Sequence, residues 1–301
     1  MRVREADSLL PVPSGSLQIA EGIFLADVIL SFTTEKVKNP PIQLSLIIPT
    51  YQEAQNIKKI ISQITSLLNQ VMPNAYELIV VDDNSPDQTW KLAQALMVDY
   101  PHLKVMRRVE ERGLSTAVIR GWQMSRGEVL GVMDADFQHS PDTLLKLWSE
   151  IKRGADLAIA SRHLEGGGIK DWSLLRQFLS HGAKIIGLIL LPDVLSRVSD
   201  PMSGYFLIRR SCLVGCPMSP LGYKILIEVL ARGKILKIAE LGYVFQERRE
   251  GKSKVTAKHY LDYLQHLVRL RFSLGSINQI IEQFSKISQH PNSCMQSIKR
   301  R

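Results

Sequence analysis

The stretch from Leu44 to Glu53 reads LSLIIPTYQE and decides the fold. Residues 44–48 form a short apolar run that ends at Pro49, which is typical of a buried strand. Residues 56–69 then carry apolar side chains at helical spacing, and residues 76–81 form a second apolar run. A strand, a helix and another strand in this order predict parallel strands joined by a crossover helix.

The same alternation continues along the chain. It predicts further strands at 104–107, 129–133 and 156–160, and further helices at 87–100, 115–126 and 142–153. We therefore predict an α/β fold, with a mostly parallel sheet and helices on both of its faces. Sheets of this kind bind ligands at the carboxyl ends of their strands, so the functional residues are expected directly after the apolar runs.

The composition excludes several classes of protein. The chain has 301 residues, 45% of them apolar and 22% charged, which is average globular usage and rules out a disordered, collagen-like or disulfide-scaffold protein. No apolar run reaches the roughly 18 residues of a membrane-spanning helix. Three cysteines favour a reducing compartment. The net charge of +9 suits nucleic acid, an anionic membrane surface or a phosphorylated substrate.

The first part of the chain differs from the rest. Residues 1–43 contain scattered prolines and no sustained pattern, so we predict an irregular N-terminal extension with one short helix at 17–32. No compact apolar block with a small-residue cleavage site follows Met1, and we expect no signal peptide.

Acidic residues follow three of the predicted strands. They are Glu53 after the first strand, Asp82 and Asp83 after the second, and Asp134 and Asp136 after the fourth. Because the carboxyl ends of parallel strands share one edge, these acids are expected to lie near one another. Chance solubilising charges do not explain three such positions.

Asp134 and Asp136 indicate a metal site. Residues two apart on extended chain point to the same side, and Gln138 continues the series. Oxygen ligands of this kind suit Mg²⁺ or Mn²⁺, which one or two carboxylates and substrate phosphates can hold. The alternative is an ordinary polar turn after a strand.

Asp82 and Asp83 have two possible roles. A carboxylate at a strand end can accept hydrogen bonds from a base or a ribose, and we assign this role to Asp82. Asp83 or Ser85 can instead cap the next helix, since Asp and Ser favour helix starts.

Other nucleotide-binding and catalytic signatures do not occur in the chain. It has neither Gly-x-x-x-x-Gly-Lys-Ser/Thr nor Gly-x-Gly-x-x-Gly, which disfavours an ATPase or a dinucleotide oxidoreductase. It has no Gly-x-Ser-x-Gly elbow, and its seven histidines form no pair at metal-ligand spacing.

A resemblance to a known family now emerges. Four motifs occur in the order seen in family 2 glycosyltransferases: PTYQE at 49–53, VDDNSPD at 81–87, DADFQH at 134–139 and SR at 161–162. Three further motifs narrow the resemblance to one branch of this family: SDPMSGYF at 199–206, GYKIL at 222–226 and RREGKSK at 248–254. From residue 44 to about 255, the chain resembles the dolichyl-/polyprenyl-phosphate mannosyltransferases.

The resemblance implies a GT-A fold, a nucleotide-sugar donor, a divalent cation and inversion at the anomeric carbon. It implies that the nucleoside is held by Pro49, Tyr51, Glu53, Val80 and Asp82. It implies a metal held by Asp134, Asp136 and Gln138, with Ala135 lining the site, and donor phosphates met by Arg162, Lys224, Arg248 and Lys254. The expected catalytic group is Asp136, Arg162 and Asp200, with Asp200 orienting the acceptor loop.

The chemistry of the expected reaction agrees with these residue types. A metal on the diphosphate neutralises the charge that develops on the leaving group. A lipid phosphate monoester has a second pKa of about 6 and is mostly dianionic near neutral pH. Such a nucleophile needs no general base, so we expect the enzyme to position charges rather than move protons.

Two segments indicate contact with a membrane surface. Residues 173–184 are predicted as an amphipathic helix with a basic face, which either lies in a membrane interface or buries its apolar face in the domain. Residues 258–284 are predicted as a second, interfacial helix. Residues 248–271 hold seven basic residues against two acidic ones, which favours an anionic surface. We expect a 44–257 catalytic domain that binds peripherally to the cytoplasmic face of a membrane, followed by a flexible tail at 285–301.

Three functions remain open. The first is transfer of mannose from GDP-mannose to a polyprenyl (dolichyl) phosphate. The second is transfer of glucose or an N-acetylhexosamine from a UDP-sugar to the same acceptor. The third is non-catalytic binding of a nucleotide-sugar or a nucleic acid. The intact Asp134, Asp136 and Gln138 argue against a non-catalytic nucleotide-sugar binder. Nucleic-acid binding is disfavoured because the basic residues are not interleaved with a base-stacking motif.

Overall fold

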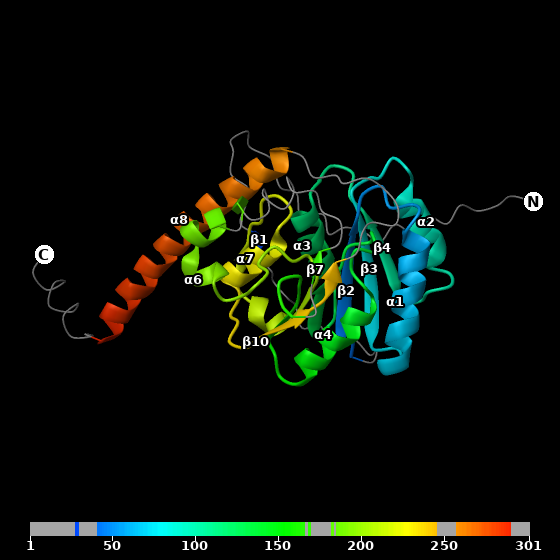
Figure 1. Cartoon of the computed structure of the whole chain (residues 1–301), viewed down its shortest axis with the longest axis horizontal. Coiled ribbons are helices and arrows are strands. Elements are labelled where there is room, and N and C mark those ends of the chain that lie inside the picture. Colours follow the sequence, from blue (N-terminus) through cyan, green and yellow to red (C-terminus); the bar gives the residue numbers. More distant parts are fainter. Residues whose placement is uncertain are drawn as a thin grey trace, which may run out of the picture.

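A seven-stranded sheet forms the centre of the molecule (Figure 1). The computed structural model describes residues 41–165, 182–183, 185–245 and 257–289, together with the short strands β1 (Val28–Ile29) and β7 (Gly168–Ile169). From one edge to the other, the strands of the sheet are β10 (Ile238–Gly242), β6 (Leu157–Ser161), β8 (Phe206–Arg209), β5 (Val129–Val132), β2 (Leu44–Thr50), β3 (Tyr76–Asp82) and β4 (Leu103–Arg107).

All pairs in this sheet are parallel except those of β8, which runs antiparallel to both β5 and β6. The parallel strands therefore have their carboxyl ends along the same side of the sheet, at right angles to its two edge strands, and this side is the edge that holds the site. These strands include β2, β3, β4, β5 and β6. The predicted mostly parallel α/β fold is confirmed, and β8 brings the segment before Phe206 to the same edge, because its amino end lies there.

Helices cover both faces of the sheet. One face carries α1 (Ile57–Val71), α2 (Thr89–Leu96) and α4 (Asp142–Lys152). The other carries α3 (Leu114–Met124), α6 (Pro192–Leu195), α7 (Ile225–Arg232) and α8 (Ala257–Gln289). The remaining short elements are the 3₁₀ turn Arg210–Leu213, β9 (Pro217–Met218), which pairs with β1, and β11 (Val244–Phe245), which pairs with β7.

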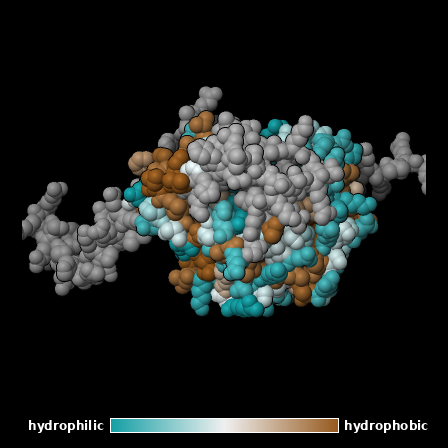
Figure 2. All heavy atoms as spheres, viewed as in Figure 1, coloured by the Kyte–Doolittle hydropathy of each residue, from teal (hydrophilic) through white to brown (hydrophobic). Residues whose placement is uncertain are grey.

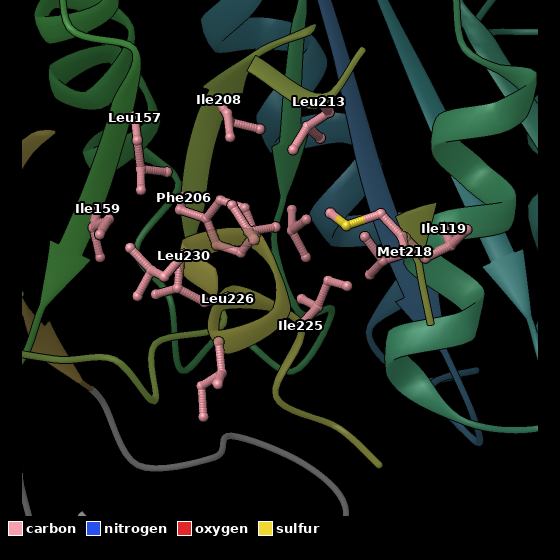
Figure 3. Close-up of a cluster of buried hydrophobic side chains, with 14 of the residues drawn as sticks. Ile119, Leu157, Ile159, Phe206, Ile208, Leu213, Met218, Ile225, Leu226 and Leu230 are labelled. Carbon is pink, nitrogen blue, oxygen red and sulfur yellow. The ribbon is translucent and has the colours of Figure 1, made fainter. Parts of the chain in front are cut away.

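The alternation of side chains along β2 explains the two cores. Leu46 and Ile48 pack in the cluster under α1, α2 and α4, whereas Ile47 packs in the cluster under α3 and α7. Figure 3 shows the second cluster, where Phe206 of β8 lies among side chains of α7 such as Leu226. A strand buried on both faces needs a continuous apolar run, which is what the sequence of β2 supplies.

The predicted strands and helices between residues 44 and 160 are all present, with boundaries shifted by a few residues. Two expectations at the ends of the chain need correction. Val28 and Ile29 form strand β1 inside the segment predicted as a helix at 17–32, since β-branched residues favour strands when a partner is available. Residues 1–27 and 30–40 lie outside the described part of the chain.

At the other end, α8 continues through Gln289 and includes the first residues of the predicted flexible tail at 285–301. Residues 285–289 contain no glycine or proline, the two residues that most disfavour helix. Residues 290–301 lie outside the described part.

No helix in the described segments has both the length and the apolar content that crossing a membrane requires.

Gly121 sets the distance between α3 and the sheet. A Cβ at this position would lie 2.7 Å from Cγ2 and 2.9 Å from Cγ1 of the buried Ile47. We expect Gly121→Val to lower the free energy of unfolding by about 1–3 kcal/mol, because the helix must move off the strand. Urea denaturation measures the change.

Gly275 of α8 is the control, because no atom lies within 4 Å of its built Cβ. Gly275→Ala is expected to leave stability unchanged or to raise it by up to about 1 kcal/mol. Equal destabilisation by both substitutions would contradict the packing argument.

Candidate functional site

The loops after the parallel strands hold unusual backbone conformations. Four non-glycine residues in the loops after β2, β3 and β5 have positive φ angles, namely Gln52 at 56°, Asn84 at 54°, Gln88 at 61° and Phe137 at 59°. Such conformations cost energy and persist where the surrounding structure fixes them, which is frequent at functional sites. The loops at this edge are therefore candidates for ligand binding.

The loop after β5 carries the predicted metal ligands. Asp134 is half-buried, whereas Asp136 and Gln138 are buried. The positive φ of Phe137 turns the chain so that the backbone N–H of Gln138 donates to Asp136 Oδ1 at 3.1 Å. Ala135 is 2% exposed and packs under the loop in the core beside α4. The predicted ligands thus come from one tight turn.

The segment before β8 closes over this turn. A Cβ added to Gly204 would lie 3.3 Å from Asp134 Oδ2, so any larger residue would press on that carboxylate. The ring of His139 stacks on the ring of the next residue, Tyr205, with centroids 5.0 Å apart. The motifs at 134–139 and 199–206, which are far apart in sequence, therefore form one site.

Arg162 and Asp200 form a buried ion pair in this site. Arg162 donates from Nε to Asp200 Oδ2 at 2.7 Å and from Nη2 to Oδ1 at 2.8 Å, and its backbone N–H donates to Oδ2 at 3.1 Å. Burial alone would raise the pKa of Asp200, but the hydrogen bonds and charge of Arg162 outweigh it and lower this pKa to about 2. Asp200 is therefore ionised and fixes the plane of the guanidinium.

Tyr243, just after β10, shows that the acidic and basic residues share one environment. Burial raises its pKa well above the usual value, the charge of Arg162 lowers it, and the carboxylates of Asp200, Asp134 and Asp136 raise it further. The structure thus brings together the predicted catalytic residues Asp136, Arg162 and Asp200, with Asp134 beside them.

Lys224 and His139 complete the described part of the site. The Lys224 ammonium donates to the backbone oxygen of Met202 at 2.9 Å and lies 4.5 Å from the ring centroid of Tyr223. Burial, and then the charges of Arg162 and Lys224, lower the pKa of His139 to about 3, so its ring is neutral. The positive charges of Arg162 and Lys224 thus both act on His139, whose ring stacks on Tyr205.

The residues predicted to bind the nucleoside differ in how exposed their side chains are. Tyr51 is half-buried and lines an open pocket, whereas Pro49 and Val80 are buried. Glu53 is 9% exposed; its backbone N–H donates to Thr89 Oγ1 at 2.9 Å, and its carboxylate accepts a hydrogen bond from Asn56. Their direct contacts to a nucleoside stay predictions.

Asp82 has no exposed surface. Its carboxylate accepts hydrogen bonds from Thr50 Oγ1 at 2.8 Å and from the backbone N–H and the hydroxyl of Ser85 at 2.8 and 2.6 Å. In the described structure Asp82 therefore ties the end of β2 to the loop after β3, and its predicted contact with the ligand stays a prediction.

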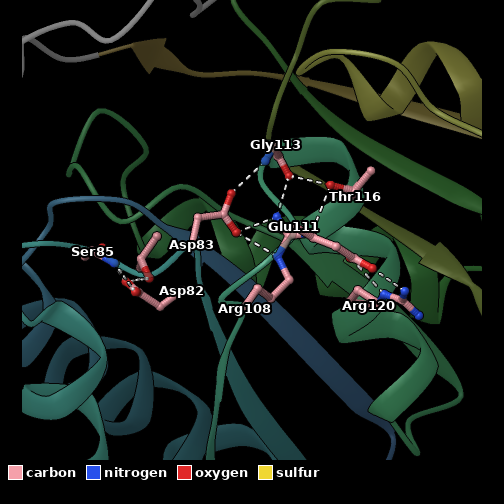
Figure 4. A network of polar contacts seen from close by, with 9 residues as sticks. Asp82, Asp83, Ser85, Arg108, Glu111, Gly113, Thr116 and Arg120 are labelled. Carbon is pink, nitrogen blue, oxygen red and sulfur yellow. Dashed lines mark hydrogen bonds and ion pairs between the residues drawn. The ribbon is translucent and has the colours of Figure 1, made fainter.

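Asp83 anchors the loop after β4 instead of capping a helix (Figure 4). It forms an ion pair with the buried Arg108, and its Oδ2 accepts a hydrogen bond from the backbone N–H of Gly113 at 2.7 Å. Arg108 also donates to the backbone oxygen of Gly113 at 2.8 Å and to Thr116 Oγ1 at 2.9 Å. The loop at 108–113 is thus held rigidly at the site edge.

Two predicted phosphate-binding residues, Arg248 and Lys254, lie outside the described residues, as does most of the predicted amphipathic helix at 173–184.

Sequence reasoning missed the pocket residues Trp90, Arg107 and Arg112. Arg107 is the last residue of β4, so the rule that drew attention to Asp82 and Asp134 would have found it if applied to basic residues.

The comparisons with known proteins define the class of the chain. The model of the family described as glycosyl transferase family 2 matches residues 45–214, and the chain belongs to this family. It is therefore a glycosyltransferase, as the resemblance predicted.

The similar curated proteins narrow the class. The chain is 43% identical over 240 residues to the dolichol-phosphate mannosyltransferase of Pyrococcus furiosus, covering 80% of this chain and 67% of that protein. It is 35% identical over 250 residues to the protein of the same name from Saccharomyces cerevisiae, covering 80% and 91%. It is 35% identical over 229 residues to the polyprenol monophosphomannose synthase of Mycolicibacterium smegmatis, covering 73% and 83%.

Solved structures with a similar fold include two sugar-phosphoglycerate synthases. The mannosyl-3-phosphoglycerate synthase of Rubrobacter xylanophilus aligns with a TM-score of 0.56 and 20% identity, over 81% of this chain and 75% of that one. The glucosyl-3-phosphoglycerate synthase of Mycobacterium tuberculosis, in a complex with Mn²⁺ and UDP, aligns with a TM-score of 0.56 and 19% identity, over 77% and 80%. These likenesses confirm the predicted GT-A type of fold.

Proposed function

We propose that this chain transfers mannose from GDP-mannose to a polyprenyl phosphate, with inversion and with the help of Mg²⁺ or Mn²⁺. The observation that carries the proposal is that the segment 199–206 joins the acidic and basic residues: Gly204 lies against Asp134, Asp200 pairs with Arg162, and Met202 accepts a hydrogen bond from Lys224. Two anionic reactants have to meet in such a reaction, and this edge offers both a carboxylate pair and cations. The names of the curated relatives agree with this substrate pair.

The residues present fit a divalent cation. Asp134, Asp136 and Gln138 offer only oxygen ligands, which Mg²⁺ and Mn²⁺ prefer, and the missing Cβ of Gly204 leaves room beside Asp134 Oδ2. Among the described residues, no group of three or more acidic, histidine or cysteine side chains is placed to hold a metal ion. Mg²⁺ is commonly held by one or two carboxylates together with substrate phosphates, and we propose the same here. When bound, the cation supplies neutralisation of the diphosphate charge.

The acceptor requires no general base from the protein. A phosphate monoester is already mostly dianionic at neutral pH. Asp200 fits this expectation because its pKa of about 2 makes it a weak base, and both of its oxygens bind Arg162. Arg162, held in this way, can orient a phosphate oxygen without losing its own geometry.

An apolar surface supports the proposed contact with a membrane. Figure 2 shows apolar side chains over the first half of α8 and the helical segment 185–190 beside it. The most exposed are Ile189 and Phe272, each 72% exposed, Leu261 at 60% and Ile185 at 55%. The hydroxyl of Tyr263 donates to the backbone oxygen of Ala183 at 2.8 Å, which joins the two segments. We propose that this surface meets the cytoplasmic face of a membrane.

Charged substitutions on this surface test the membrane contact. Ile189→Asp and Leu261→Asp are each expected to weaken binding to vesicles of anionic phospholipid by about tenfold or more, since burying such a side chain contributes about 1.5–3 kcal/mol. Vesicle co-sedimentation measures binding. Leu236→Asp is the matched control, because Leu236 is 92% exposed at the start of the β10 region. Equal loss with all three variants would refute this surface as the contact.

A donor screen tests the proposed reaction. The full chain is incubated with a polyprenyl phosphate and Mg²⁺ or Mn²⁺, and with GDP-mannose, UDP-glucose or UDP-N-acetylglucosamine. Formation of a polyprenyl-phosphate sugar from GDP-mannose in clear excess is expected. A preference for a UDP-sugar would favour the second function, and binding of a nucleotide-sugar with no transfer to any acceptor would refute catalysis.

A further inference from the structure

Glu240 lies in the middle of β10, one of the two edge strands of the sheet (Figure 1). β10 runs parallel to β6, and Glu240 lies opposite Ile159. Because side chains alternate along a strand, Glu240, Ile159 and Ser161 point to the same face of the sheet, the one that α3 and α7 cover. Glu240 is half-buried there, so its carboxylate needs polar partners within the protein.

The carboxylate of Glu240 binds the start of the segment that precedes β8. The backbone N–H of Ser199 donates to both of its oxygens, at 2.9 Å each, and the hydroxyl of Ser199 donates to Oε1 at 2.8 Å. The backbone N–H of Asp200 makes a longer bond of 3.4 Å to the same Oε1. Hydrogen bonds to a charged group are stronger than those between neutral groups. Glu240 therefore fixes the backbone that carries Asp200.

Ser161 joins this contact to the strand that carries Arg162. Ser161 is the last residue of β6 and is fully buried, and its hydroxyl lies 2.7 Å from the hydroxyl of Ser199. The next residue, Arg162, donates to both oxygens of Asp200. β10, β6 and the start of the segment before β8 thus converge on the ion pair of Arg162 and Asp200.

The end of the segment nearest to β8 has anchors of its own. The hydroxyl of Ser203 donates to the backbone oxygen of Ala160 in β6 at 2.7 Å, and the ring of Tyr205 stacks on the ring of His139. Gly204, which lies against the carboxylate of the metal-binding turn, is held between these two anchors. A change at the β10 carboxylate is therefore expected to act on the arginine side of the site and to leave the turn after β5 in place.

We propose that Glu240 is a positioning residue for sugar transfer: it fixes Ser199 and Asp200, and through them the orientation of the Arg162 guanidinium. Its carboxylate acts through these residues and not on a reactant. A displacement of about 1 Å in a group that meets the reacting phosphates can cost a factor of about 10² in rate. The proposal rests on the proposed phosphate-binding role of Arg162, but not on the identity of the transferred sugar.

Three substitutions in the full chain test the proposal. Glu240→Leu removes the acceptor oxygens, whereas Glu240→Gln keeps one oxygen that can accept from Ser199. Asp156→Leu is the matched control, because Asp156 is also half-buried and its Oδ2 accepts from the backbone N–H groups of Leu236 and Lys237 at 3.0 and 2.9 Å. It holds a loop to the same pair of strands, at the ends remote from the site.

Steady-state kinetics give the first readout, with a polyprenyl phosphate and the donor that the wild type prefers. Glu240→Leu is expected to lower kcat about ten- to a hundredfold and to change KM for the donor less than about threefold, since an orientation needed in the transition state affects kcat alone. Glu240→Gln should lose less than about tenfold, because one acceptor oxygen remains. Asp156→Leu should match the wild type in both constants.

The kinetic outcomes distinguish positioning from support of the fold. If Glu240 only stabilises the fold, both Leu variants lower the urea midpoint of unfolding and the folded proteins keep the wild-type kcat. That result, an equal fall of kcat in both, or a higher KM with unchanged kcat would overturn the proposal. Glu240→Gln as slow as Glu240→Leu would also overturn it, because hydrogen bonds from Ser199 would then not carry the effect.

Hydrogen exchange of the guanidinium gives a second readout that needs no reaction. The Nε proton of Arg162 is donated to Asp200 inside the protein, and its NMR signal is identified by its loss in Arg162→Met/Asp200→Leu. Glu240→Leu is expected to speed its exchange with solvent by about tenfold or more, and Asp156→Leu to leave it unchanged. Unchanged exchange in Glu240→Leu would overturn the proposal. A wild type that transfers sugar from no donor would instead refute the proposed function, while exchange would still decide whether Glu240 fixes Arg162.

Discussion

Asp136→Asn is expected to lower the rate of sugar transfer by about 10²–10³-fold while the protein stays folded. The substitution keeps the size of the side chain and its hydrogen bond from the backbone of Gln138, but it removes one of the two carboxylates that the turn offers to a cation. The expected size of the loss is that of one preorganised electrostatic group at a centre where charge develops. Steady-state transfer with GDP-mannose and a polyprenyl phosphate measures it.

The matched control for this experiment is Asp99→Asn, because Asp99 is an exposed carboxylate after α2, outside the site. It should retain wild-type activity. Binding of Mn²⁺ in the presence of GDP, followed by the paramagnetic broadening of solvent protons, should weaken only in Asp136→Asn. Wild-type activity under excess chelator, or a loss of cooperative unfolding in Asp136→Asn, would contradict a metal-binding role.

The fold could be predicted because its central strands are mostly apolar. Residues 44–48 and 76–81 are buried on both faces, so hydrophobic runs mark them without reference to any partner. β8 was not predicted from the pattern, because its four residues, Phe206–Arg209, are too short to show a period and its antiparallel direction depends on two distant strands. β1 depends in the same way on β9.

The site could be predicted in part. The position of a residue at a strand end follows from the order of the elements, and this located Asp134, Asp136 and Asp82. The order of the elements does not show which carboxylate oxygens already have hydrogen-bond partners within the protein. Asp82 accepts hydrogen bonds from Thr50 and Ser85, and Asp83 pairs with Arg108, which is 25 residues away in sequence. Such pairings are properties of the folded chain and leave no periodic signal.

The buried ion pair of Arg162 and Asp200 leads to the second large effect, this time on stability. Asp200 has no exposed surface and Arg162 is 9% exposed. Asp200→Ala is expected to lower the free energy of unfolding by about 3–5 kcal/mol, because it leaves the guanidinium buried without its partner. Transfer activity should fall as well, since Arg162 loses the carboxylate that fixes its plane.

The double variant Arg162→Met/Asp200→Leu separates the two roles. Removing both charges leaves only the backbone N–H of residue 162 without its acceptor, so unfolding in urea should return to within about 1–3 kcal/mol of the wild type. Activity should stay lost, because the cation that meets the phosphates is gone. Activity that returned together with stability would show that the pair only holds the fold.

The pH dependence of unfolding gives an independent reading of the same pair. The folded pKa of Asp200 is about 2, below its ordinary value of 3.8, so the folded state binds fewer protons than the unfolded state in this range. The pair therefore stabilises the protein fully above about pH 4, and its contribution is lost as the pH falls towards 2. Urea unfolding of the wild type should weaken across this window more steeply than that of the double variant. Identical slopes for the two proteins would mean that Asp200 is not the group held ionised by Arg162.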